Sequence, residues 1–431
     1  MLSRDIRSVQ RRLMNVLADE LDLAVIGGGA SGFFAAIQYA EIAPRRKVAI
    51  FEKSNQVLQK VRISGGGRCN VTHACFDPKD LAKNYPRGSR ELLAAFHRWQ
   101  PADMIAWFKS HGVTLKTEAD GRMFPVTDSS ETVIECFVEC ARSCKVPLFL
   151  KHVLIGIEQS ENGGFSLEFE GCADKILARA ICLATGSLQS ATLRGVLEKL
   201  GQNIEQPLPS LFSFNVADAR LHELAGVSHP DVIVRMDGAK TSQRGPLLVT
   251  HRGFSGPAIL RLSAWEAREM AACHHHFAIL IDWLPELDLA SLRNRFAENR
   301  SHQGAKRIYN TPIPPVSRRL WERIVECCGI DDTVTWGQIS KPATQALIDA
   351  LKGSRFDVIG KTTHKDEFVT CGGVSRKCID FRTMESRVTP GLYFTGECID
   401  IDGITGGFNF QAAWTTAQIA ATAIAARVKG G

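Results

Sequence analysis

Three glycines and one acid near the start of the chain are spaced as a nucleotide site needs them. Gly27, Gly29 and Gly32 form a G-x-G-x-x-G turn, and Glu52 follows about 20 residues beyond the last of them. The first glycine permits a tight turn, the second lets backbone approach a pyrophosphate, and the third lets a helix pack on a strand. The Glu52 carboxylate can accept hydrogen bonds from a ribose. The pattern predicts a dinucleotide site.

The elements around this turn have the composition that would position it. The apolar run 21–26 predicts a buried parallel strand, 33–43 predicts an apolar helix, and 47–51 predicts a second strand that ends at Glu52. A helix N-terminus offers free N–H groups to phosphates. Ala30 and Ser31 in the turn and Lys53 after the second strand complete the predicted contacts. Because strand, turn, helix and acid all occur together, the motif is stronger than a lone glycine pattern.

A second glycine-rich block follows and brings polar groups that could face a ligand. Its residues are Ser64, Gly65, Gly66, Gly67, Arg68, Cys69 and Asn70. Successive glycines let another backbone or a ligand lie against the chain. The hydroxyl, guanidinium and amide groups of the block suit an anion or a heterocycle. The alternative is a flexible linker.

The C-terminal part of the chain contains matching features. The run 181–186 predicts a buried strand that ends in Thr185-Gly186, and 391–397 predicts another that ends in Gly396-Glu397. A long apolar helix then begins after Gly406-Gly407-Phe408-Asn409, and its N-terminus could hold a polar ring or a phosphate. We therefore expect both ends of the chain to build the nucleotide site, with the middle as an insertion.

The predicted secondary structure changes in the middle of the chain. Between 206 and 281, short β-rich runs separated by turn signals predict an antiparallel sheet or barrel. From 287 to 351 the pattern is helical and basic, with prolines that break it. The basic residues could form a nucleic-acid face, but the glutamates among them favour a solvated surface.

Composition limits the class of protein. The chain has 431 residues, 45% of them hydrophobic and 23% charged, with a net charge of +6, which suits a globular protein of two or three domains. Thirteen scattered cysteines without a disulfide framework, and no visible secretory signal, predict a cytoplasmic protein. Residues 1–20 are expected to form an N-terminal extension. The apolar stretch 412–426 is too short to span a membrane, and no His or Cys set has metal-ligand spacing.

Taken together, the motifs resemble a known family. GGGASG, ISGGGRCN, FPVTDSS, LLVTHRGFSGPAIL, TCGGV, TPGLYFTGE and DGITGGFNFQ are similar to motifs of the HI0933-like (BaiN/aminoacetone oxidase-type) flavoproteins, from about Leu21 to the C-terminus. The resemblance implies non-covalent FAD and an α/β fold. A Rossmann-like FAD-binding domain of the glutathione reductase/fumarate reductase type would be interrupted by a β-barrel that carries a helical insert. The expected boundaries are 21–204 and 356–431 for the FAD domain, 205–286 and 340–355 for the barrel, and 287–339 for the insert.

The resemblance also implies roles for single residues. Gly27, Gly29 and Gly32 would hold the FAD pyrophosphate, and Glu52 the adenosine ribose. Further expected cofactor contacts are Lys60 and the Ser64–Asn70 block at the flavin, Val153 at the adenine, Thr185 and Gly186 over the nucleotide, Gly396 and Glu397 near the ribityl chain, and Gly406, Gly407, Phe408 and Asn409 beneath the isoalloxazine. One departure is the run Ser187–Gly195, which is several residues shorter than the family's loop and lacks its Gly-Asp-Gly. This departure puts a shared substrate in doubt.

The function implied is that of an FAD-dependent oxidoreductase acting on a small organic substrate. Flavin itself transfers hydride at N5, and the protein positions the substrate. An oxidase would pass electrons from an amine or alcohol to O₂, whereas a reductase would use NAD(P)H to reduce an activated C=C bond. Arg68, Asn70 and His251 are the candidate catalytic residues, with a structural histidine as the alternative for His251. The rival hypothesis is a non-catalytic or RNA-associated flavoprotein related to flavin-dependent tRNA-modifying proteins.

Overall fold

The computed structural model describes residues 20–160, 163–362 and 369–429. The predicted N-terminal extension therefore lies outside the described residues, except for its last one. The chain forms two compact units: Met1–Pro207 with Val369–Gly431, and Leu208–Phe368. The second unit is thus an insertion into the first, as the sequence motifs predict.

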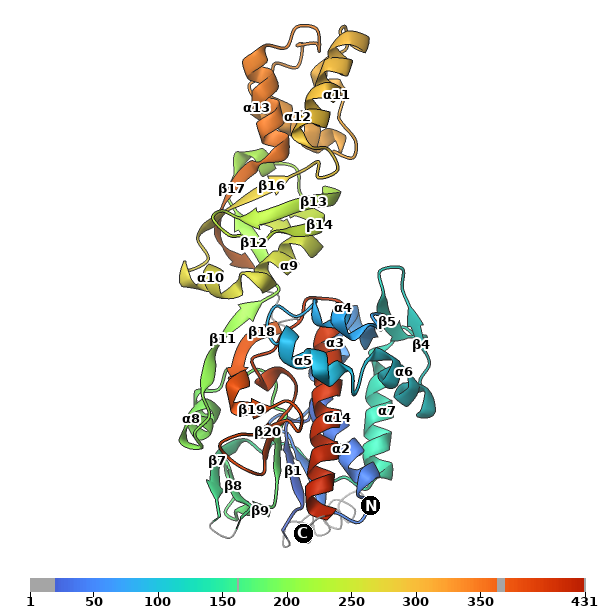
Figure 1. Ribbon diagram of the computed structural model, residues 1–431, viewed down its shortest axis with the longest axis vertical. Coiled ribbons are helices and arrows are strands. Elements are labelled where there is room, and N and C mark those ends of the chain that lie inside the picture. The colour runs from blue at the N-terminus through green and yellow to red at the C-terminus, as the bar shows by residue number, and fades with distance from the viewer. Residues whose placement is uncertain (1–19, 161–162, 363–368, 430–431) are drawn as a thin grey trace, which may run out of the picture. The chain divides into compact units, whose positions relative to one another are not determined.

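A seven-stranded sheet forms the centre of the first unit, and five of its strands are parallel (Figure 1). In spatial order these are β21 (Leu392–Phe394), β10 (Ile181–Leu183), β1 (Leu23–Ile26), β2 (Val48–Phe51) and β6 (Leu148–Phe149). The first four strands are buried along their whole length, which explains why they read as continuous apolar runs. Helices α2 (Ala30–Ile42) and α14 (Phe408–Lys429) pack along each other beside the sheet (Figure 1).

Smaller elements complete this unit. Two short antiparallel strands, β20 (Glu385–Ser386) and β19 (Ile379–Asp380), extend the sheet beyond β21. One three-stranded sheet contains β7 (Leu154–Gln159), β8 (Phe165–Phe169) and β9 (Ile176–Ala178), and another contains β3 (Thr72–His73), β5 (Arg122–Pro125) and β4 (Leu115–Thr117). The other α-helices are α3 (Gln59–Gly67), α4 (Pro78–Ala82), α5 (Ser89–Phe96), α6 (Pro101–Ser110), α7 (Ser130–Ser143) and α8 (Ala191–Lys199). Two short 3-10 turns are η3 (Arg376–Cys378) and η4 (Gly396–Cys398).

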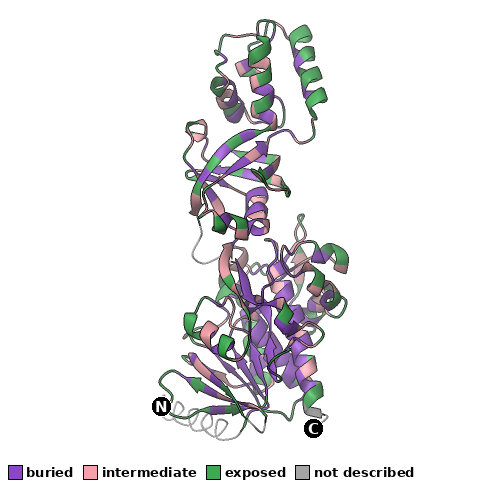
Figure 2. Ribbon diagram, turned by 60° about the vertical axis from the view of Figure 1, so that its left-hand side comes forward, coloured by how far each residue is buried: buried purple, intermediate pink, exposed green. Residues whose placement is uncertain are grey.

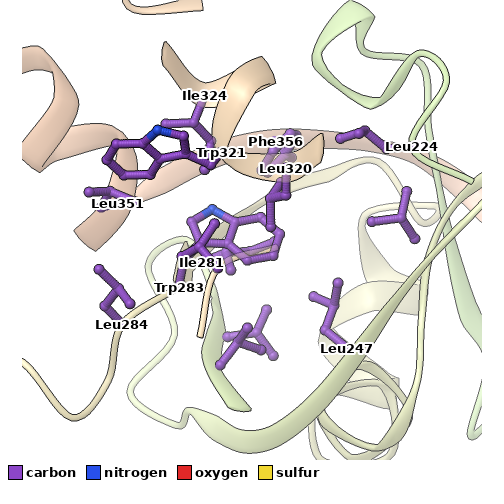
Figure 3. Close-up of a cluster of buried hydrophobic side chains, with 14 of the residues drawn as sticks. Leu224, Leu247, Ile281, Trp283, Leu284, Leu320, Trp321, Ile324, Leu351 and Phe356 are labelled. Carbon is purple, nitrogen blue, oxygen red and sulfur yellow. The ribbon is translucent and has the colours of Figure 1, made fainter. Parts of the chain in front are cut away.

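The second unit contains a closed six-stranded barrel and five α-helices of the described residues. The strand order is β12 (Ser213–Val216), β15 (Gly253–Ser255), β14 (Gln243–Thr250), β13 (Ser228–Met236), β16 (Phe277–Asp282) and β17 (Ser354–Thr362). Helices α9 (Pro257–Trp265) and α10 (Ala267–Ala272) follow β15, and α11 (Leu289–His302), α12 (Arg318–Cys327) and α13 (Lys341–Lys352) lie between β16 and β17. Figure 3 shows Trp283 and Phe356 from the barrel packed with Leu320 and Trp321 from α12. One apolar core therefore joins barrel and helices.

The boundaries of the helical part and of the barrel differ from those predicted from the sequence. The helical part extends to α13, which ends at Lys352, rather than to 339, and the chain returns to the first unit at Val369 rather than at 356. The reason is that the alternating pattern of 354–362 is barrel strand β17, buried on every second residue at its start. The two crossings between the units are strands β11 (Ile204–Ser210) and β18 (Val369–Val374), which pair with each other.

Some of the basic residues of the helical part pair with acids of the same helices. Three ion pairs within helices α11 and α12 join Arg295 to Glu298 at 3.9 Å, Arg318 to Glu322 at 2.6 Å and Arg323 to Glu326 at 3.1 Å. Figure 2 shows the long exposed faces of these helices. Pairs at this spacing are typical of a solvated helix surface.

The described residues contain neither a membrane-spanning helix nor a cluster of metal-ligating side chains. Within residues 20–160, 163–362 and 369–429, no helix is long and apolar enough to cross a membrane. Over the same residues, no group of three or more His, Cys, Asp or Glu side chains is arranged to hold a metal ion.

Candidate nucleotide-binding site

The predicted site motifs follow the carboxyl ends of neighbouring parallel strands. The glycine turn follows β1, Glu52 follows β2, Thr185-Gly186 comes just after β10, and Gly396-Glu397 comes just after β21. Because these strands are parallel, their carboxyl ends meet at one edge of the sheet, where α/β proteins bind ligands. The fold thus gathers segments from both ends of the chain.

The turn between β1 and α2 has one glycine that faces open space. A Cβ on Gly32 would lie 1.9 Å from the carbonyl oxygen of Gly27, so packing requires glycine there. A Cβ on Gly29, in contrast, would meet no atom within 4 Å. Gly29 is also the N-cap of α2, which has no capping side chain and no acid in its first turn. The helix therefore presents free N–H groups and its positive end to an open space that fits a pyrophosphate.

The Glu52 carboxylate is held beside this turn. One oxygen accepts a hydrogen bond from the Gly28 N–H at 2.7 Å, and the other accepts from the Ser54 N–H at 2.8 Å. Each carboxylate oxygen has a second lone pair that can accept from a hydroxyl. Glu52 therefore couples the glycine turn to the end of β2 while retaining acceptors for a ribose.

The second glycine block is the distorted end of helix α3 rather than a free loop. Ser64, Gly65 and Gly66 depart from helical geometry. Gly66 and Gly67 have φ of +69° and +84°, and a Cβ on either would meet nothing within 4 Å. Backbone without side chains is thus exposed here, as close approach by a flat ring requires.

The Arg68 guanidinium is engaged within the protein. It pairs with Glu118 at 2.6 Å and Asp128 at 3.5 Å, and it lies 4.0 Å from the centre of the Phe124 ring. The hydrogen bond with Glu118 raises the pKa of Arg68. These partners support a role for Arg68 in holding the end of α3. Whether it also contacts a flavin stays a prediction.

Asn70 joins the glycine block to the start of α14. Its amide fits its surroundings when the nitrogen donates to the Thr72 carbonyl oxygen at 3.0 Å and the oxygen accepts from the Gly407 N–H at 3.0 Å. The adjacent Cys69 is fully buried, and burial raises the pKa of its thiol to about 12. Cys69 is therefore a neutral packing residue at physiological pH.

Glu397 connects the end of β21 to α3. Its carboxylate pairs with Lys60 and accepts a hydrogen bond from the Thr370 N–H at 2.9 Å. The preceding Gly396 is close to the glycine turn, because a Cβ there would lie 2.8 Å from the Ser31 Oγ. Lys60, Ser31, Gly396 and Glu397 thus lie together, as the sequence motifs predict.

Helix α14 begins at this cluster. A Cβ on Gly407 would lie 2.5 Å from the Thr72 carbonyl oxygen, so backbone approaches backbone closely there. The Asn409 amide accepts from the Gly403 N–H at 2.8 Å and donates to the Gly403 carbonyl at 2.9 Å, which closes the loop before the helix. Phe408 is buried. Asn409 and Phe408 therefore shape the loop.

The remaining predicted features are His251, Val153 and the short run after Gly186. His251 is exposed in the turn between β14 and β15, which is part of the second unit. The Val153 carbonyl accepts from the Glu170 N–H at 2.9 Å. Hydrogen bonds within the short run after Gly186 stabilise its conformation. Arg194 donates to the carbonyls of Leu188 and Gln189 at 2.8 and 2.7 Å.

Two features near the cluster were not anticipated from the sequence. His73 stacks on Phe408, with ring centres 4.6 Å apart. Arg87 and Asp402 form a buried ion pair between the start of α5 and the loop before α14. The position of His73 three residues after Asn70 was a signal in the sequence, but no local pattern connects Arg87 to a partner more than 300 residues away.

A solved structure shares this architecture. The open conformation of a flavocytochrome c3 fumarate reductase matches with a TM-score of 0.50 and 12% identity, over 97% of this chain and 80% of that one. A Rossmann-like sheet, an uncapped α2 N-terminus beside open backbone and an acid after β2 with free acceptor positions fit FAD. The protein is a flavoprotein oxidoreductase with FAD as its cofactor.

Sequence comparison gives the family. The model for the HI0933-like protein Rossmann domain matches residues 21–423, and the chain belongs to this family. It is similar to "Ribosomal RNA dihydrouridine synthase" of Escherichia coli (strain K12), with 31% identity over 93% of this chain and 96% of the relative. It is also similar to "3-dehydro-bile acid delta(4,6)-reductase" of Clostridium scindens, with 26% identity over 94% of this chain and 99% of the relative.

Proposed function

We propose that this protein reduces a carbon–carbon double bond that is conjugated to a carbonyl group. One observation supports this reaction above others: the two named relatives cover more than nine-tenths of the chain and differ in substrate but share this chemistry. Formation of dihydrouridine saturates the uracil double bond next to a carbonyl. A delta(4,6)-reductase of a 3-dehydro steroid saturates double bonds conjugated to a ketone.

The cofactor supplies hydride transfer at flavin N5 when it is bound. The chain's residues would hold it: the α2 N-terminus and Gly29 at the pyrophosphate, Glu52 at the ribose, and the exposed backbone of Gly66 and Gly67 at the ring. The N-terminus of α14 adds a second positive helix end at the same edge of the sheet. Arg68, Asn70 and His251 remain candidate catalytic residues for the substrate side.

NADH or NADPH is the proposed source of electrons. The family motifs include one dinucleotide turn, which FAD would occupy, so the donor would bind only transiently. The proposed direction is reduction, with the amine or alcohol oxidase as the alternative.

Anaerobic stopped-flow spectroscopy tests both points. Mixing the flavin-loaded protein with NADH or NADPH should bleach the flavin absorbance, and a conjugated enone or a uracil-containing RNA should restore it faster than O₂ does. Rapid reoxidation by O₂ alone, after reduction by an amine or alcohol, would contradict the proposal and favour an oxidase. Heat release of the flavin followed by chromatography should give FAD rather than FMN.

A further inference from the structure

A groove on the first unit carries an excess of positive charge. It has a volume of about 440 Å³ and is lined by residues of helix α5, by Arg98 just after it, and by the segment 376–387. Helix α5 and the strands β19 and β20 of that segment are labelled in Figure 1. Its basic side chains are Arg90, Arg98, Arg376, Lys377, Arg382 and Arg387, and only two acids, Glu91 and Asp380, line it with them. We call this feature the basic groove.

The cations of the basic groove are not all neutralised. Asp380 pairs with Arg382 at 2.7 Å and lies 3.9 Å from Arg387, so one acid serves two arginines. Arg90 and Lys377 are exposed and make no ion pair with any described residue. Exposed positive charge in a concave surface raises the local concentration of anions.

We call the edge of the sheet where the carboxyl ends of β1, β2, β10 and β21 meet the cofactor edge. Strand β18 connects the basic groove to this edge. At one end of this strand the Thr370 N–H donates to Glu397, and just beyond its other end Arg376 lies 3.5 Å from Asp400. Six residues separate Thr370 from Arg376, which limits their separation to about 20 Å for an extended chain. A polymer with one unit at the cofactor edge could thus place neighbouring units in the basic groove.

We propose that the basic groove binds the phosphate backbone of RNA whose uracil base is presented to the cofactor edge. This inference rests on the proposed function, in the form where the conjugated double bond belongs to uracil. The chemistry of the groove favours this partner, because arginine forks bind phosphate oxygens through two hydrogen bonds. The helical part of the second unit is the less suitable face, since three of its arginines, Arg295, Arg318 and Arg323, already pair with glutamates of the same helices.

Two charge-reversal variants test whether RNA binds the basic groove or the helical part. Arg90→Glu with Lys377→Glu changes the basic groove, whereas Arg293→Glu with Lys306→Glu changes the helical part by the same charge. All four residues are exposed and make no ion pair within the described parts of the chain, so both variants should fold. Melting temperature and FAD content should match the wild type in both.

The measurement is binding of a short uridine-rich RNA by the flavin-loaded full-length protein across a series of salt concentrations. We expect the groove variant to bind at least about tenfold more weakly, and the slope of log affinity against log salt to fall by about 1.4 for two lost phosphate contacts. The control variant should bind as the wild type does. Wild-type binding by the groove variant, or a loss confined to the control, would overturn the inference.

Two further measurements keep this inference distinct from the proposed function. If the wild type reduces a small conjugated enone but no RNA binds, the groove inference fails and the proposed function stands. If RNA binds through the groove but no double bond is reduced, the proposed function fails. If the groove variant loses NADPH binding and keeps RNA binding, the groove is a dinucleotide site, and the RNA inference is overturned.

Discussion

At the residue scale, Glu52 is the predicted ribose contact, and its substitution tests the nucleotide site. Its carboxylate accepts from the N–H groups of Gly28 and Ser54, and it has further lone pairs for a ribose. Glu52→Ala should weaken FAD binding ten- to hundredfold, since a hydrogen bond to a charged group contributes roughly 1.5 to 3 kcal/mol. The FAD affinity is measured by titrating the protein with FAD and monitoring the quenching of FAD fluorescence.

Glu52→Gln is the matched control for that prediction. Glutamine keeps one acceptor oxygen and the shape of the side chain, so it should lose less affinity and less stability than alanine. Equal FAD affinity in the wild type and Glu52→Ala would show that Glu52 only closes the turn through its backbone partners.

The contacts of Arg68 within the protein indicate that its removal affects stability more than flavin chemistry. With Glu118, Asp128 and Phe124 around its guanidinium, its removal should mainly loosen the end of α3. We expect Arg68→Ala to lower the melting temperature and to leave the flavin midpoint potential close to that of the wild type. Arg68→Lys keeps the charge and should recover only part of the stability, because lysine lacks the planar fork. A large drop in potential at unchanged stability would instead assign Arg68 to the flavin.

At the element scale, two glycines with the same backbone conformation allow a controlled test of the open site. Gly67 in the end of α3 has φ of +84°, Gly112 after α6 has φ of +80°, and a Cβ on either would meet nothing within 4 Å. Alanine at either position should therefore cost about 1 kcal/mol of stability through backbone strain. Only Gly67→Ala should also weaken FAD binding, because only its methyl group would enter the cofactor space. Equal FAD affinity in both variants would remove Gly67 from the site.

The cysteines of helix α7 give a prediction about pH. A hydrogen bond with the Cys136 thiol lowers the pKa of Cys140 to about 7, whereas burial raises the pKa of Cys144, the C-cap residue of the same helix. The thiolate is the reactive form, so alkylation of Cys140 by iodoacetamide should rise as pH increases through about 7. Cys144 should react only at higher pH. Peptide mass spectrometry after short pulses measures both rates, and a Cys140 midpoint near 9 would contradict the assignment.

Local sequence patterns predicted the elements of the first unit well for a physical reason. Strand β1, the turn at Gly27–Gly32 and the acid Glu52 are neighbours in sequence, and each shows its role by residue type. The insertion was harder to delimit, since β17 at 354–362 pairs with strands far back in the chain. The basic groove and the Arg87–Asp402 pair depend on contacts across hundreds of residues, which spacing along the chain does not reveal.

At the scale of the whole molecule, the chain consists of two units, and the predicted FAD contacts fall in the first of them. Every residue that the structure gathers at the cofactor edge belongs to the first unit, whereas His251 belongs to the second. The two crossing strands run antiparallel: the Ser375 N–H donates to the Asn203 carbonyl at 2.8 Å, and Gly372 lies against Gln206. The ends of β11 and β18 at the unit boundary therefore lie side by side.

This arrangement predicts that the first unit binds FAD without the second. Deleting 211–368 and joining Ser210 to Val369 through an Asn-Gly turn should close the two strands as a hairpin. We expect the shortened protein to bind FAD within about threefold of the wild type, a difference of roughly 0.65 kcal/mol. Glu52→Ala in the shortened protein should reproduce its effect in the full chain, which would show that the same site is occupied. A shortened protein with native circular dichroism but no FAD affinity would mean that the barrel unit completes the cofactor site.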